Sequence, residues 1–323
     1  MSRRQIVGCL LVIAGLAAVA AWQRRPADDG TRGPEILVPE GTLTLAALGR
    51  IEIRREGRDG ESVVLARAGD GWVLPERDGA PASAEHLERL VDAVDGLVGE
   101  ARANEVGLLP DFELAGDGAF ELVFQDAAGT QVLWLGVGKR GPRVNRSFVR
   151  RQGDDRAWLG HASLHGALGI HGHGDRPFDP DFFLDLHLLG VEAEQVTGLT
   201  VEGESPWAVA RDGDGAPWRW AAGSGDAAPD ERQATGRAHS AARARAAGLV
   251  GRRPPGQVGL APPFARFTVF HAGATAALRV GDPVPADPGE EHPREERYVA
   301  IEGSDLVWRM SQGVVDALIR PLE

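Results

Sequence analysis

Cysteine is almost absent from this 323-residue chain, because Cys9 is the only one. A single thiol excludes an internal disulfide framework and any zinc or iron–sulfur site built from several cysteines. Positive charge is also scarce: 35 Lys and Arg residues face 47 Asp and Glu residues, and the net charge is −12. This balance argues against a general nucleic-acid-binding protein.

Aromatic residues make up only 6% of the chain, whereas hydrophobic residues make up 43% and charged residues 25%. These fractions are typical of a globular protein and argue against intrinsic disorder. The 43 glycines and 21 prolines predict many turns between short elements. A chain of this length has material for about two domains, each with its own core.

An uncharged run near the N-terminus extends from Ile6 to Trp22, with arginines on both sides. As a helix it would be roughly 26 Å long, near the lower limit for crossing a bilayer. The sequence therefore predicts a membrane anchor in residues 1–25, although a cleaved signal peptide with Ala18-Val19-Ala20 as its cleavage site stays open. The anchoring residues would be Ile6, Leu10, Leu11, Ile13, Leu16 and Trp22.

The chain after this segment is strongly acidic. Residues 26–44 are rich in Gly, Pro and Asp, which is typical of a flexible linker. One short N-terminal helix before a large acidic part predicts a single-pass protein of the cytoplasmic (inner) membrane with an extracytoplasmic C-terminal domain. The lipid bilayer would then be its first partner.

Two sets of motifs recur about 150 residues apart. Gly107–Phe112 resembles Gly259–Phe264, and Phe148–Asp155 resembles Tyr298–Asp305. Because these matches occur in the same order with slowly drifting offsets, they predict an internal duplication. Repeat 1 would occupy residues 45–190 and repeat 2 residues 191–323.

Both repeats predict the same series of elements. An opening strand (51–54; 199–202) precedes a hairpin (63–66 with 72–74; 207–210 with 218–221) and a helix (83–98; 229–249). Four strands (120–124, 131–137, 147–151, 157–159; 266–271, 276–280, 297–301, 306–310) and a closing helix (162–168; 312–319) follow. The predicted fold class is α+β: an N-terminal transmembrane helix, then two tandem repeats, each a mainly antiparallel sheet with packed helices.

This order of elements resembles a bacterial envelope family called domain of unknown function 4340. The motifs that carry the resemblance are Gly71-Trp72, the Leu-rich helix 87–98, Gly107–Pro110, Leu135-Gly136 and Phe148-Val149-Arg150. Phe148 stands where the family usually has tyrosine. The resemblance covers roughly residues 45–323. It implies a membrane-tethered, extracytoplasmic protein associated with a gliding-motility-type ABC transporter, without established catalytic residues.

Histidines concentrate between residues 161 and 187 and offer a candidate for metal chemistry. His161 and His165 are four residues apart on a predicted helix, so both imidazoles could face one zinc ion. His171, His173 and Asp175 could add ligands from a Gly-rich loop, but ordering that loop would be costly. Because no His-Glu-x-x-His pattern accompanies them, we expect no preorganised site and no cofactor.

The two long helices predicted for the repeats differ in charge. The first carries four acids against one base, Arg89, and the second region carries six arginines against two acids, Asp230 and Glu231. The acids of the first are Glu85, Glu88, Asp92 and Asp95, and the arginines of the second are Arg232, Arg237, Arg243, Arg245, Arg252 and Arg253. Such faces are usually solvated. The alternative is that the basic stretch docks an acidic partner or an anionic lipid surface.

These patterns together predict a non-enzymatic, membrane-tethered accessory protein that works with an ABC-type transporter complex. Two alternatives stay open. One is a metal-binding protein or metal-dependent enzyme that uses the 161–173 segment. The other is a glycan- or peptide-binding module with a groove between the repeats.

Overall fold

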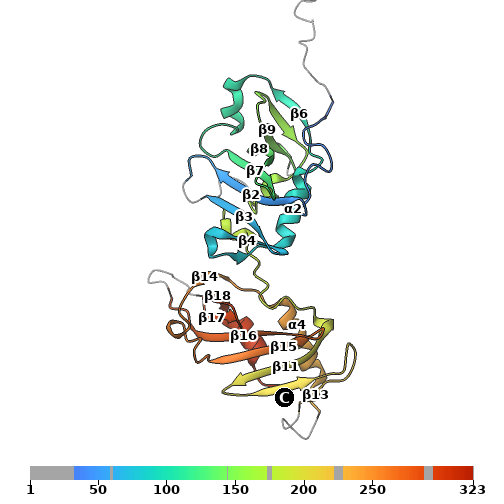
Figure 1. Ribbon diagram of the computed structural model, residues 1–323, viewed down its shortest axis with the longest axis vertical. Coiled ribbons are helices and arrows are strands. Elements are labelled where there is room, and N and C mark those ends of the chain that lie inside the picture. Colours follow the sequence, from blue (N-terminus) through green and yellow to red (C-terminus); the bar gives the residue numbers. More distant parts are fainter. Residues whose placement is uncertain are drawn as a thin grey trace, which may run out of the picture.

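The computed structural model describes residues 33–58, 61–143, 145–172, 177–221, 228–286 and 294–322. These residues form two lobes, drawn one above the other in Figure 1. Each lobe is built on one large sheet, with ten strands in the first and eight in the second. All the strand pairs in both sheets are antiparallel.

The strands of the first lobe are β1 (Glu35–Ile36), β2 (Leu48–Arg55), β3 (Ser62–Ala68), β4 (Gly71–Leu74), β5 (Ala80–Pro81), β6 (Val98–Ala103), β7 (Phe120–Asp126), β8 (Gln131–Arg140), β9 (Ser147–Arg151) and β10 (Ala157–Gly160). They lie in the order β1-β6-β10-β9-β8-β7-β2-β3-β4-β5. The helices are α2 (Ala84–Val94) and α3 (Leu164–Ala167), with short 3-10 helices η1 (Pro75–Arg77), η2 (Val106–Phe112) and η3 (Pro180–Phe183).

The strands of the second lobe are β11 (Val196–Gly203), β12 (Trp207–Ala210), β13 (Arg219–Trp220), β14 (Gly248–Arg252), β15 (Ala265–His271), β16 (Ala274–Pro283), β17 (Glu296–Ile301) and β18 (Leu306–Ser311). They lie in the order β13-β12-β11-β15-β16-β17-β18-β14. The helices are α4 (Glu231–Arg243) and α5 (Gln312–Ile319), with η4 (Ala193–Gln195) and η5 (Pro255–Gln257).

The two sheets share one strand order. Starting from β6, the first sheet continues through β10, β9, β8, β7, β2 and β3 to β4. Starting from β14, the second continues through β18, β17, β16, β15, β11 and β12 to β13. When β1 and β5 are left out and the strands of each half are counted along the chain, each position in the first sheet holds the strand with the same number as in the second sheet. The first sheet adds β1 at one edge and β5 at the other.

Helix α2 forms where the apolar spacing predicts it, with its buried face turned to the core. Ser83 is the N-cap and its side chain accepts a hydrogen bond from the His86 backbone N–H. The helix ends at Val94 rather than at residue 98, because Gly96 has a φ of +68° and the chain then enters β6. Strand β6 was not predicted, since its partner β10 lies far along the chain.

Helix α4, like α2, is shorter than the sequence predicts. It begins after the N-cap Asp230 and ends at Arg243, whereas the sequence predicts a helix over residues 229–249. The last residues of that predicted helix belong to β14, which pairs with β18 at the edge of the second sheet. Tertiary pairing therefore overrides the helical propensity of this Ala-rich stretch.

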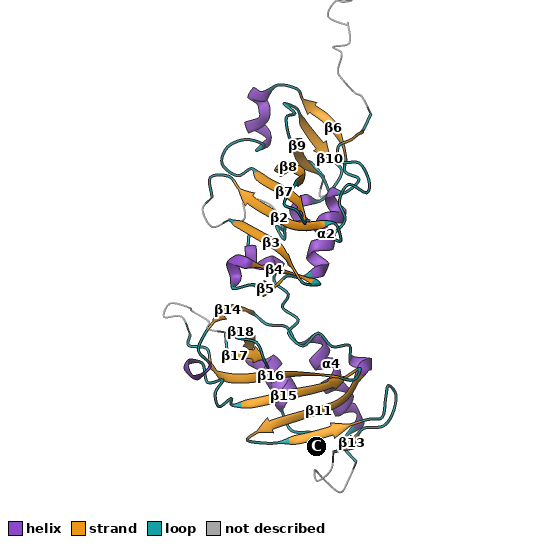
Figure 2. Cartoon of the chain, viewed as in Figure 1, coloured by secondary structure: helices purple, strands orange, loops and turns teal. Residues whose placement is uncertain are grey.

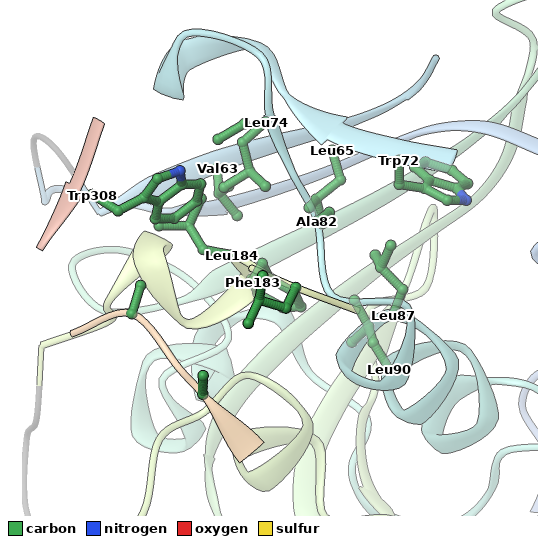
Figure 3. Close-up of a cluster of buried hydrophobic side chains, with 14 of the residues drawn as sticks. Val63, Leu65, Trp72, Leu74, Ala82, Leu87, Leu90, Phe183, Leu184 and Trp308 are labelled. Atoms are coloured by element: carbon green, nitrogen blue, oxygen red, sulfur yellow. The ribbon is translucent and has the colours of Figure 1, made fainter. Parts of the chain in front are cut away.

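Buried apolar side chains from both lobes form one continuous cluster. Figure 3 shows Trp308 of β18 beside Val63, Leu74 and Leu184, and Trp308 is only 2% exposed. A polar contact lies at the same junction, where the Arg252 backbone N–H donates to the Asp78 carboxylate at 3.0 Å. The lobes are thus joined by packing as well as by the connecting chain.

The structure corrects the expected fold class. Figure 2 shows that strands dominate both lobes and that helices are few. Among the helices of the described ranges, not one is long and apolar enough to cross a membrane. The longest, α4, has 13 residues and spans roughly 20 Å, and only one side of it is apolar. The expected single-pass inner-membrane location is corrected with it; the predicted anchor, residues 6–22, lies outside the described residues.

Candidate functional site

The histidines that suggested a metal site have separate partners. His161 lies between β10 and α3, outside the helix that was expected to carry it. Its Nε2 donates to the Glu100 carboxylate at 3.0 Å. This hydrogen bond is the main cause of a lowered pKa at Glu100; partial burial opposes it, and the charges of Arg102 and Arg146 add to it. His161 therefore belongs to a surface ion-pair network on β6.

His165 has a structural environment of a different kind. It is buried in α3, with Nδ1 3.3 Å from the Ser147 hydroxyl. That hydroxyl also donates to the Ala162 carbonyl and accepts from the Leu164 N–H, so it fastens the start of α3 to β9. Burial, followed by the nearby charges of Arg140 and Arg55, lowers the pKa of His165 to about 4. The imidazole is neutral at pH 7.

His171 is exposed, while His173 and Asp175 lie outside the described residues. Within the described part of the chain, no group of three or more His, Cys, Asp or Glu side chains is arranged to hold a metal ion. His161 and His165 do not converge on a common point through their hydrogen bonds. The arrangement explains two of these histidines as structural groups.

An open groove lies on the second lobe between α4 and α5, which sequence reasoning did not identify. From α4 the lining residues are Gly236, His239, Ser240 and Arg243; from α5 they are Gly313, Val314 and Ala317. Helix α5 packs on the sheet at β15 and β17, and α4 packs beside α5.

Helix α4 buries smaller side chains than its counterpart in the first lobe. The buried residues of α4 are Ala234, Ala238 and Ala241. In α2, the helix at the same place in the first lobe, the buried residues are Leu87, Leu90, Val91 and Val94. The three alanines belong to the core, and the groove is lined by other residues of α4.

The closing helices show the same contrast. At an offset of 150 residues, Val314 and Ala317 of α5 correspond to Leu164 and Ala167 of α3. Leu164 is 0% exposed and Ala167 is 3% exposed. Val314 and Ala317 are half-buried and line the groove instead. The first lobe fills this surface from within, and the second leaves it open.

Gly236 stands in the middle of α4 although no packing contact requires a glycine there. A Cβ atom at Gly236 would meet nothing within 4 Å, and the same is true of Gly313. Glycine inside a helix costs about 1 kcal/mol relative to alanine. The described residues alone therefore give no structural reason for this glycine.

Basic side chains border the groove. His239 and Arg243 are exposed on α4, and Arg232 is exposed one turn before Gly236. Among the described residues, none of these three side chains has a carboxylate, carbonyl or aromatic partner. Most other arginines have one, for example Arg77 with Asp181 or Arg156 with Asp154.

The acids of the same two helices are engaged in local structure. The Asp230 carboxylate caps α4, Glu231 accepts the backbone N–H of Trp218, and Asp316 accepts from Gln312. Arg237 is also occupied, because its guanidinium donates to the carbonyls of Ala317 and Arg320 at the end of α5. The groove is therefore bordered by an unpaired guanidinium and an unpaired imidazole, while the carboxylates of its two helices are held by local hydrogen bonds.

The architecture is that of a two-lobed antiparallel-sheet protein with a basic groove on one lobe. Against known families, the model described as domain of unknown function (DUF4340) matches residues 72–247. This match covers more than half of the chain, and the chain belongs to this family. It runs from β4 in the first lobe to the residue before β14 in the second. No curated protein and no solved structure matches the chain.

Proposed function

We propose that this protein is a non-catalytic interaction protein, an accessory component of a larger complex, and that a partner docks in the α4–α5 groove. The observation that carries the proposal is the contrast between the lobes at this surface. Leu164 and Ala167 of α3 are buried in the first lobe, whereas the corresponding Val314 and Ala317 of α5 line an open groove in the second. The unpaired side chains of His239 and Arg243 border that groove.

We also propose that the two halves are tandem copies of one unit. The shared strand order supports this proposal, and so does one detail of the packing. A Cβ atom at Gly138 of β8 would collide with the carbonyl oxygen of Phe112, and one at Gly281 of β16 with that of Val258. The segment before β7 therefore packs directly on a glycine of β8, and the segment before β15 packs in the same way on a glycine of the corresponding strand β16.

The partner is proposed to be a transporter complex of the ABC type. This part rests on the resemblance of the motifs at residues 71–72, 107–110 and 148–150 to their family. The family description itself assigns no activity. A docking role suits the arrangement, because the groove offers shape and charge, and its Ser240 hydroxyl donates to the Gly236 carbonyl within α4.

Site-specific photo-cross-linking tests the proposal. His239 is replaced by p-benzoylphenylalanine in cells, and Asp92, which has the corresponding place in α2 counted from the N-cap, is replaced in a matched control. We expect an adduct from position 239 whose second protein is a subunit of an ABC-type transporter, and none from position 92. Equal adducts from both positions, or a product without a transporter subunit, would overturn it.

A further inference from the structure

We infer that the α4–α5 groove binds an acidic α-helix of the partner. This inference rests on the proposed function and adds the chemistry of the docking segment. Three features of the groove carry it: its walls, its glycine and the spacing of its cations.

The walls of the groove favour a helix over an extended strand. Both walls are helices, and backbone N–H and C=O groups within a helix are already bonded to each other. An extended segment needs a sheet edge to satisfy its own backbone groups. A helix satisfies its backbone internally and needs only side-chain packing, so it suits a groove that offers no sheet edge.

Gly236 allows a partner helix to lie close to the backbone of α4. Packed helices lie 8–10 Å apart, and the residue at the contact sets the distance. With no Cβ at Gly236 and nothing within 4 Å of that position, a third helix can approach the α4 backbone directly. Ser240 and Ala317 add only small side chains to the same floor. The otherwise unexplained glycine then has a packing role in the complex.

The cations set the charge of the partner helix. Arg232, Gly236, His239 and Arg243 are spaced i, i+4, i+7 and i+11, so they share one side of α4 over roughly 16 Å. A helix that lies along this side would bring acids spaced by three or four residues against the cations. In the first lobe the corresponding helix exposes Glu85, Glu88 and Asp92, and only Glu85 of these is paired, with the exposed Arg89. Like charges there would reject the same partner helix, which gives the two lobes different specificity.

An anionic membrane is a poorer occupant than a helix. The groove is concave between two helices and therefore selects an elongated ligand rather than a flat one. Helix α2 of a second copy is acidic too, and the experiment below separates it from a foreign helix.

The test measures fluorescence anisotropy of a labelled, hydrocarbon-stapled helical peptide titrated with the full chain. The peptide has Glu at positions 1, 4, 8 and 11 and Ala at the other unstapled positions; a matched peptide has Lys in place of each Glu. We expect saturable binding of the Glu peptide only. His239→Glu with Arg243→Glu should weaken binding at least tenfold, whereas Arg143→Glu, on the first lobe, should leave it unchanged.

Gly236→Leu provides a second variant that keeps the charges. It fills the groove at a position with free space, so the thermal unfolding midpoint should not fall while peptide affinity drops at least tenfold. Equal affinity for all four proteins would overturn the inference, as would binding of the Lys peptide. If the chain binds vesicles containing phosphatidylglycerol more strongly than it binds the Glu peptide, the occupant of the groove is a membrane and not a helix. If the chain sediments as a dimer and dimer formation displaces the peptide, the occupant is a second copy of the chain.

The two proposals can fail separately. If position 239 cross-links to a transporter subunit but the Glu peptide does not bind, the chemistry of the partner segment is wrong and the docking function stands. If neither result is obtained, both proposals fail.

Discussion

Helices α2 and α4 hold the same place in two sheets of the same strand order, but they present opposite surfaces. Helix α2 buries Leu and Val and exposes acids, whereas α4 buries Ala and exposes Arg and His. The sheet beneath does not require either choice. One scaffold can therefore carry helices of opposite surface charge, and its closing helix buries Leu164 in the first lobe but leaves the corresponding Val314 lining a groove in the second.

Trp158 and Trp308 make the same comparison inside the lobes. Both are buried on corresponding strands. The indole N–H of Trp158 donates to Asp154 at 3.0 Å, and the Arg156 guanidinium lies 4.4 Å from its ring centre. Trp308 instead packs against side chains of the other lobe (Figure 3). Tryptophans at corresponding positions therefore have different roles: Trp158 packs inside the first lobe, and Trp308 packs at the junction between the two lobes.

The largest effect should come from Trp158→Ala. Removal of a buried tryptophan side chain should lower the free energy of unfolding by about 3–5 kcal/mol. We expect amide hydrogen exchange to accelerate first in β6, β9 and β10. Trp308→Ala is the matched variant, and it should accelerate exchange in both lobes. Identical exchange patterns for the two variants would contradict the assignment of Trp158 to the interior of one lobe and Trp308 to the junction between the lobes.

The second prediction concerns the shared close contact of turn and sheet. Gly138→Ala and Gly281→Ala should each lower the free energy of unfolding by about 1–3 kcal/mol, because the new methyl group would collide with a backbone carbonyl. Urea titrations measure both variants. Gly107→Ala is the control, since a Cβ there meets nothing within 4 Å. Destabilisation by only one of the two substitutions would contradict the equivalence of these strands.

The third prediction is an acid sensitivity confined to the first lobe. Burial alone would raise the pKa of Asp154, but hydrogen bonds from Arg156, Trp158 and Arg151 outweigh it and hold the pKa well below the usual 3.8. The stabilisation is therefore present above about pH 3.8 and is lost as pH falls below it. In the second lobe Ser304 makes the corresponding turn, through its hydroxyl and the Leu306 N–H.

Asp154→Ser converts the first turn to the chemistry of the second. It should cost about 1.5–3 kcal/mol at pH 7, where charged hydrogen bonds are lost. The cost should shrink as the pH falls toward 3, measured by urea unfolding at several pH values. A cost that stays constant over this range would show that the carboxylate charge is not what stabilises the turn.

The smallest predicted effect is a gain. Gly236→Ala should raise the free energy of unfolding by about 1 kcal/mol, because alanine is the better helix residue and the site has room for a methyl group. Differential scanning calorimetry would record it as a higher midpoint. A lower midpoint would mean that the glycine already serves a contact within the folded chain.

Much of this fold could be predicted from local sequence. Strands β9 and β12 and helix α5 have the expected bounds, since alternation, turn residues and capping act over a few residues. Strands β6 and β14 could not be predicted, because short runs such as residues 98–103 become strands only through distant partners. Local apolar content also predicted a membrane-spanning helix, and the helices that the structure describes correct that fold class.

The candidate site was predictable only in its charge. The basic stretch around Arg232 and Arg243 is visible in the sequence, but the groove is not, because it depends on how closely α5 lies beside α4. The many small residues between positions 234 and 242, interrupted by Arg237 and His239, are the signal that could have indicated it. The spacing of His161 and His165 left a shared metal site open as an alternative, but the chain gives each histidine its own partner.

The central claim is that the second lobe binds its partner in the α4–α5 groove while the first lobe does not bind it at the corresponding surface. Chemical-shift mapping of the full chain with the Glu peptide tests this most directly. The account predicts that amide shifts concentrate in residues 236–243 and 313–317 and that α2 is unaffected. Shifts on α2 and α3, or shifts spread over both lobes without saturation, would contradict it.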